Sequence, residues 1–297
     1  EGRNSMSLHF VPSFCRSPLV SLAVVVLLLA GAPLINARVK KIIIDKKESP
    51  AFNGRTFGDA GQYETLAGRA FGELDPKDPH NALITDISLA PKNAAGKVEY
   101  MATFYLVKPI DMSKSSHLLW HDVPNRGGRI TIAAAERNFG DVGLSSGWQG
   151  DSSGRTAPGP DNDYVVVPVA KNPDGSPITG LVMARIMNAS GKDSRPLIVH
   201  NNPMPYRSVS LATVHATLTT HASDTIDGVI GETKTIPSRD WAWGRCGAGK
   251  PFPGSPDPTQ ICLKNGFDPK LLYQVVFTAK DPYVLGIGFA AFRDVAS

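Results

Sequence analysis

The C-terminal segment, residues 281–297, constrains the fold more than any other part of the chain. Asp281 followed by Pro282 predicts the start of a helix, because an acceptor side chain caps the first N–H groups and proline suits the first helical position. The residues that follow are apolar over most of the helix surface, which is typical of a helix packed against a sheet. Gly286 and Gly288 weaken this helix by about 1 kcal/mol each relative to alanine. No glycine, asparagine or proline follows Asp294, so we expect the chain to end inside the helix.

Short β-branched or aromatic runs, bounded by turn residues, predict strands in the first half of the chain. They are residues 39–44, 82–87, 100–107 and 118–123. A further pair, 164–169 and 178–187, is joined by Asn172-Pro173-Asp174-Gly175, a strong turn sequence that predicts a hairpin. These runs predict a strand-rich region from residue 39 to about residue 123.

The composition excludes several classes of partner and cofactor. A net charge of +4 on 297 residues, with lysine pairs only at Lys40-Lys41 and Lys46-Lys47, provides no basic stripe for nucleic acid. His200, His215 and His221 lack the spacing of a helical metal pair, and no histidine pair accompanies the cysteines, so no metal site is indicated. We therefore expect neither nucleic-acid binding nor a cofactor, and a small-molecule substrate whose identity stays open.

The N-terminal residues 1–37 have the order of a secretory signal. An uncharged run, 19–34, follows Arg16, and Ala37 provides a small residue just before Arg38. The alternative is an uncleaved membrane anchor, but Pro33 and the shortness of the run favour cleavage. We therefore expect a signal over 1–37, a folded domain over 38–297 and export to the periplasm or the cell exterior, with no stable membrane anchor after cleavage.

Export affects the interpretation of the two remaining cysteines. Cys246 and Cys262 bracket a loop rich in glycine and proline, and disulfides persist outside the cytoplasm. A bond across a loop of this length would stabilise the fold by about 3 kcal/mol in the chain-entropy model, while two unpaired thiols remain the alternative. The surrounding region, 203–265, holds Trp241 and Trp243 and suits either a loop-rich lid or insertion over a site, or an irregular surface excursion.

The sequence Asn125-Arg126-Gly127-Gly128 is the best candidate for a site. It follows a predicted strand at 118–123, and open α/β sheets bind ligands at the carboxyl ends of strands. Glycine lets backbone N–H groups approach a developing oxyanion closely, so this is an oxyanion-loop candidate. An ordinary Gly-Gly turn is the alternative. His121 and Asp122 point to opposite faces of the strand, so a structural role is favoured for His121 over a dyad.

One segment, Gly143-Leu144-Ser145-Ser146-Gly147, matches the G-x-S-x-G pattern of a nucleophile elbow. The elbow requires a buried strand before the serine and a helix after it. The preceding residues 136–142 are mostly polar and the following 148–160 are rich in glycine and proline. Ser145 is therefore not expected to be the nucleophile, and no residue of this chain is assigned a catalytic role.

Several stretches, in this order, resemble the α/β-hydrolase-domain proteins that are found mostly in bacteria and often carry export signals. The matching stretches are 57–64, 68–70, 75–76, 81–93, 123–127, 146–151, 266–269, Tyr273, 278–282 and 285–294. The resemblance implies an incomplete α/β-hydrolase-like sheet with a β-rich N-terminal region and a loop-rich insertion. Trp148, Gln149 and Asp151, which lie in one matching stretch, are substrate-pocket candidates.

In such proteins the segment after 289–297 would lead into a strand and the elbow serine, with the acid and the histidine later still. The resemblance therefore implies the N-terminal fragment of an esterase-like serine hydrolase, truncated before its nucleophile and inactive alone. An exported, non-catalytic ligand-binding protein that uses the β-rich region and the tryptophan-bearing loops is the alternative. A self-contained domain is disfavoured, because the terminal helix would expose a largely apolar surface.

Overall fold

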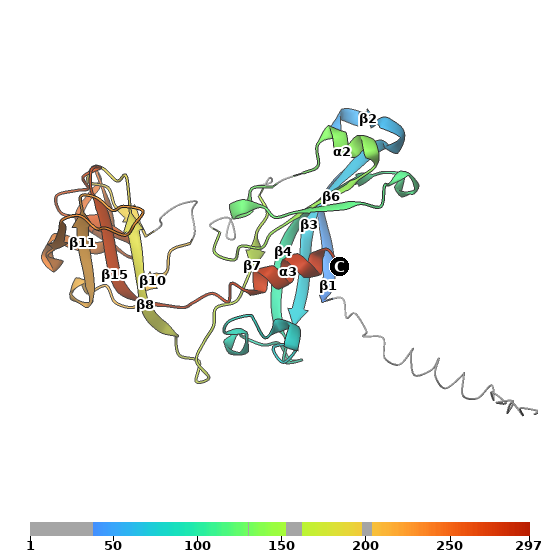
Figure 1. The fold of residues 1–297 in the computed structure, drawn as a ribbon. Helices are drawn as coiled ribbons and strands as arrows, with labels where there is room; N and C mark the ends of the chain where they lie inside the picture. Colours follow the sequence, from blue (N-terminus) through green and yellow to red (C-terminus); the bar gives the residue numbers. More distant parts are fainter. Residues whose placement is uncertain (1–37, 130, 153–161, 198–203) are drawn as a thin grey trace, which may run out of the picture. The chain divides into compact units, whose positions relative to one another are not determined.

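The structure is a computed structural model that describes residues 38–129, 131–152, 162–197 and 204–297 (Figure 1). Residues from Arg38 to Ser297 form one compact unit. The predicted signal at 1–37 lies outside the described residues. None of the helices in the described part of the chain is long and apolar enough to cross a membrane.

The expected α/β-hydrolase-like fold is wrong, because the protein is mostly β-sheet, with 46% strand and 16% helix. Its sheets are mixed or antiparallel, and their arrangement is not that of an α/β-hydrolase. Within the described residues the α-helices are α2 (Ala134–Phe139) and α3 (Ile287–Val295). The physical reason is that successive strands such as β3 (Gly61–Leu74) and β4 (Val98–Pro109) pair directly as antiparallel neighbours, so no crossover helix is needed between them.

The first sheet has seven strands in the order β1-β3-β4-β6-β5, with β2 on β3 and β7 on β4. Besides β3 and β4 these are β1 (Val39–Glu48), β2 (Thr56–Phe57), β5 (Leu119–Asp122), β6 (Val142–Ser146) and β7 (Val165–Val166). All pairings are antiparallel except that of β5 with β6, which is parallel. This one parallel pair decides where the candidate site lies.

The longest strand of the first sheet, β3, was not predicted, because its glycines break the strand pattern. An added Cβ at Gly68 would lie 2.2 Å from the carbonyl oxygen of Ile43, and one at Gly72 would lie 2.2 Å from the ring of Tyr100. Both glycines therefore allow close approach of a neighbouring strand. The reason for glycine at these two positions is close packing against neighbouring strands, and this packing can be seen only once the strands are paired.

The strand predicted at 82–87 is wrong. This region instead contains two 3-10 helices, η3 (Pro79–Asn81) and η4 (Ile87–Leu89). Asp78 caps η3 by accepting a hydrogen bond from the N–H of His80, and Asp86 has a left-handed φ of 61°. Short local capping bonds of this kind compete with strand pairing.

The other strands form a five-stranded and a three-stranded sheet. The five-stranded sheet contains β8 (Thr179–Ile186), β10 (Arg207–Ser208), β11 (Ala216–His221), β12 (Thr233–Ile236) and β15 (Leu272–Lys280), and the three-stranded sheet contains β9 (Arg195–Pro196), β13 (Trp241–Gly247) and β14 (Lys250–Leu263). The predicted hairpin between 164–169 and 178–187 is wrong, since β7 pairs with β4 and β8 pairs with β15. The turn itself forms, with Gly175 N–H donating to the carbonyl of Asn172 at 2.8 Å.

Region 203–265, expected to be loop-rich, contains strands β10 to β14 instead. Cys246 and Cys262 form a disulfide between the paired strands β13 and β14. Trp241 and Trp243 are 2% and 3% exposed, and the Trp243 ring packs edge-on against Phe277 at 5.0 Å between centroids. The two tryptophans therefore build the core of this region and do not present a ligand-binding surface.

Helix α3 begins at Ile287, not at Asp281, and it ends at Val295, before the last residue. Asp281 has φ 62° and its carboxylate pairs with Lys171 at 2.6 Å, so it does not cap the helix. Buried residues of α3, among them Ile287 and Ala291, pack into the same cluster as Tyr100 and Val165 of the first sheet. The prediction that this segment packs against a sheet is therefore correct, although its boundaries were not.

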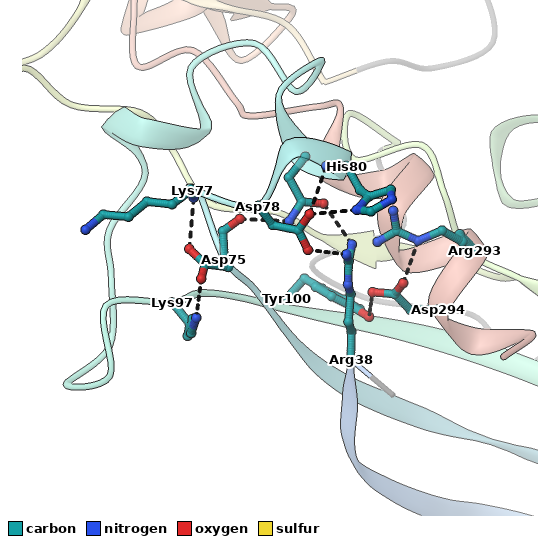
Figure 2. A network of polar contacts seen from close by, with 10 residues as sticks. Arg38, Asp75, Lys77, Asp78, His80, Lys97, Tyr100, Arg293 and Asp294 are labelled. Carbon is teal, nitrogen blue, oxygen red and sulfur yellow. Dashed lines mark hydrogen bonds and ion pairs between the residues drawn. The ribbon is translucent and has the colours of Figure 1, made fainter. Parts of the chain in front are cut away.

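Polar contacts tie α3 to β4, and the residue before β1 to the turn after β3 (Figure 2). Tyr100 donates to the buried Asp294 at 2.9 Å, and Arg293 Nε binds the other oxygen of Asp294 at 2.7 Å. Arg38 binds Asp78 and also Asn81 at 2.9 Å. Burial, together with the charge of Asp294, raises the pKa of Tyr100 well above its usual range. These contacts orient α3 relative to the sheet, and α3 in turn contacts the candidate site.

Candidate functional site

The candidate site lies where the parallel strands β5 and β6 end. Asp122 is paired with Ser145 in the β5–β6 register, so the segments that follow, 123–128 and 147–151, leave the sheet at the same edge. Parallel strands place their carboxyl ends side by side, so the residues that follow the two strands gather at one edge of the sheet. The parallel pairing itself was not predictable, because nothing in the sequence of either strand identifies its partner.

The structure brings the oxyanion-loop candidates and the substrate-pocket candidates into direct contact. Trp148 Nε1 donates to the carbonyl oxygen of Pro124 at 2.7 Å, and the backbone N–H of Arg126 donates to Gln149 Oε1 at 2.5 Å. The Arg126 guanidinium pairs with Asp151 at 2.6 Å, and both side chains are partly exposed. Two candidate sets that are separate in the sequence therefore form one cluster.

The loop conformation depends on glycine at position 127. Residues Asn125–Gly127 form a 3-10 turn, η6, in which Arg126 and Gly127 have φ values of 52° and 80°. An added Cβ at Gly127 would lie 2.4 Å from the carbonyl oxygen of Asp163. Gly128 N–H closes the turn on the carbonyl of Asn125 at 3.1 Å. The Gly128 N–H is therefore used within the turn, whereas the Arg126 N–H binds a side-chain carbonyl oxygen, that of Gln149.

Ser145, the serine of the G-x-S-x-G match, has a structural role. It lies inside strand β6 with no exposed surface, and its hydroxyl donates to Asp163 Oδ2 at 2.6 Å. Asp163 also accepts from Arg129 at 2.8 Å. A buried serine in a regular strand cannot reach a substrate, as expected from the polar sequence around it.

A second serine, Ser146, makes a contact that the sequence did not indicate. Its Oγ lies 2.9 Å from Nε2 of His121, a distance found between a nucleophile and its base. Ser146 has no exposed surface, however, and the His121 ring is stacked on Phe292 of α3 at 3.7 Å between centroids. The pair therefore holds β5, β6 and α3 together, which agrees with the structural role expected for His121.

The partial burial of His121 makes the stability of the fold depend on pH. Desolvation lowers the pKa of His121 below its ordinary value of 6.5. At pH values between the lowered pKa of the folded chain and 6.5, the unfolded chain binds more protons at His121 than the folded chain does. The contribution of neutral His121 to the free energy of unfolding is therefore fully present above pH 6.5 and is lost as the pH falls through the lowered pKa. We expect His121→Gln to flatten this part of the pH dependence of the free energy of unfolding between pH 7.5 and pH 5.5.

Urea denaturation at several pH values measures this effect. His215→Gln, at an exposed histidine, is the matched control and should keep the wild-type pH dependence. Parallel curves for wild type and His121→Gln would contradict the assignment.

The described residues contain no group of histidine, cysteine, aspartate or glutamate side chains that could hold a metal ion. Comparisons with protein families, with curated proteins and with solved structures found no match to this chain.

Proposed function

We propose that this chain forms the substrate-binding part of a serine hydrolase that acts on an ester or similar acyl bond. In this proposal the nucleophilic serine, the acid and the histidine lie beyond Ser297, where the resemblance of the sequence to hydrolases implies them. Residues 38–297 then have no turnover of their own. The chemistry would be attack on an acyl carbon with stabilisation of the tetrahedral oxyanion by backbone donors.

One contact carries the proposal. The Arg126 N–H donates to the side-chain carbonyl oxygen of Gln149, which is the same type of acceptor as the carbonyl of an ester or amide. The donor lies at the carboxyl edge of two parallel strands. A substrate carbonyl that displaced Gln149 would therefore meet an N–H held in place by the turn of residues 125–128.

Two further observations support the proposal. Ser145 and Ser146 are both buried and hydrogen-bonded, so neither competes for the role of nucleophile. The disulfide between Cys246 and Cys262 supports export to an oxidising compartment, the periplasm or the cell exterior.

The first test compares this chain with a version extended by the coding sequence downstream of Ser297. We expect the extended protein to hydrolyse p-nitrophenyl butyrate and to react with a fluorophosphonate probe, and the present chain to do neither.

In the extended protein, Gln149→Glu should lower kcat/KM about tenfold, because a carboxylate holds the Arg126 N–H more strongly than a neutral amide. Gln149→Ala removes the side chain that occupies the Arg126 N–H and should not lower kcat/KM.

Gln274→Glu, at a partly exposed position on β15, is the matched control and should leave kcat/KM unchanged. Equal hydrolysis by the present chain and the extended one would show the proposal wrong. A downstream frame without G-x-S-x-G would favour the second candidate, an exported ligand-binding protein without turnover.

A further inference from the structure

A cavity of about 250 Å³ is lined by residues other than those of the candidate site. Its walls are mostly apolar and include Ile178, Val182 and Pro282. The polar residues of its lining are Asp86, Thr179, Tyr206 and Lys280. Small-molecule sites typically combine apolar walls with a few polar groups that orient the ligand. None of the residues 124–128 or 148–151 lines this cavity, although Tyr206 lies close enough to Asp151 for the charge of that carboxylate to act on it.

The polar groups of the cavity are available to a ligand. Among the described residues, neither the Asp86 carboxylate nor the Lys280 ammonium forms an ion pair, with each other or with any other side chain. The carboxylate nearest to Lys280 in sequence, that of Asp281, is paired with Lys171 instead. The Tyr206 hydroxyl likewise makes no hydrogen bond to a described residue, and the residue is 38% exposed. Asp86 and Lys280 therefore both line the cavity, and neither has an ion-pair partner among the described residues.

We propose that this cavity binds a small zwitterion with an apolar body, such as a free amino acid with an aliphatic or aromatic side chain. The carboxylate of the ligand pairs with Lys280 and its ammonium group pairs with Asp86. The apolar side chain lies against Ile178, Val182 and Pro282. A simple anion would be repelled by Asp86 and a simple cation by Lys280, so only a ligand that carries both charges satisfies both groups.

The size of the cavity fits this class. Its volume of about 250 Å³ lies just below the usual range of ligand sites, which suits a single amino acid better than a peptide or a lipid. The assignment does not depend on the hydrolase proposal, since it uses different residues and requires no catalysis. A negative result for the cavity therefore does not contradict the hydrolase proposal, and a negative result for hydrolysis does not contradict the cavity assignment.

Calorimetric titration of the full chain with L-phenylalanine and L-leucine tests the proposal, with 3-phenylpropionate and phenethylamine as analogues that lack one charge each. We expect at least one of the two amino acids to bind, and the phenylalanine analogues to bind about tenfold more weakly than L-phenylalanine or not at all. Asp86→Asn and Lys280→Met should each weaken binding by about tenfold. Asparagine tolerates the left-handed backbone at position 86, so the first variant should keep the fold.

Asp227→Asn and Lys270→Met remove the same charges at exposed positions outside the cavity and should leave binding unchanged. Far-UV circular dichroism confirms that each variant is folded. Three results would overturn the proposal: no heat of binding with either amino acid at millimolar concentration, equal binding of L-phenylalanine and 3-phenylpropionate, or unchanged binding in both cavity variants.

Discussion

Replacing Asp163 with alanine should lower the free energy of unfolding by about 3–5 kcal/mol, the range measured when one partner of a buried ion pair is removed. The Asp163 carboxylate has no exposed surface and lies at the centre of a network across the first sheet. It accepts from Arg129 at 2.8 Å and from Ser145 at 2.6 Å. The variant leaves the Arg129 guanidinium, itself 13% exposed, without this carboxylate. Urea denaturation followed by circular dichroism measures the change.

Asp45→Ala is the matched control, because Asp45 also binds an arginine, Arg69, at 2.6 Å but on the surface. Exposed ion pairs contribute no more than about 1 kcal/mol, so this variant should stay close to the wild type. The role of Asp163 in the stability of the sheet would be refuted by equal, small effects of the two variants. The backbone N–H of Asp163 also binds the Gly127 carbonyl at 2.8 Å, a bond that alanine at this position can still make.

Gly288→Ala should be the second most damaging change, with a loss of about 3 kcal/mol in the free energy of unfolding. On helix propensity alone, alanine would stabilise α3 by about 1 kcal/mol. The structure reverses this sign, because an added Cβ at Gly288 would lie 1.7 Å from the carbonyl oxygen of Trp148. Backbone cannot yield as a flexible side chain can, so α3 would have to move away from the segment 148–151. Thermal and urea denaturation both measure the effect.

Gly286→Ala is the control within the same segment. Its added Cβ would lie 3.2 Å from a methyl group of Ile84, a contact that a small side-chain adjustment relieves. We expect this variant to change the free energy of unfolding by less than about 1 kcal/mol. If Gly288→Ala proved as stable as Gly286→Ala, α3 would not be docked on Trp148 as described.

The close approach of α3 also explains how the candidate site is supported. The Trp148 ring lies 5.1 Å from that of Phe289, and its Nε1–H binds the carbonyl of Pro124. Trp148 thus links the helix to the loop of residues 125–128. The sequence singled out Trp148 and the loop separately, but the link between them exists only because β5 and β6 run parallel.

Several local features of this protein were determined by the sequence alone. The segments at 39–44, 100–107 and 118–123 lie within strands β1, β4 and β5 or overlap them, and the turn at 172–175 closes as its residues require. The apolar pattern near the C-terminus identified a helix that packs against a sheet. These features depend on interactions between residues close together in the chain, which the sequence displays directly.

Strand partners and the α3 boundary were decided only by the tertiary structure. A strand pattern identifies which face is buried but not which strand lies alongside, so the expected partner of β8 was wrong and the pairing of β5 with β6 was not foreseen. Helix α3 begins at Ile287 and not at the predicted Asp281, because Asp281 pairs with the distant Lys171 instead of capping the helix. The contact between Arg126 and the segment of Gln149 and Asp151 arose in the same way, since it requires two chain segments to leave one sheet edge together.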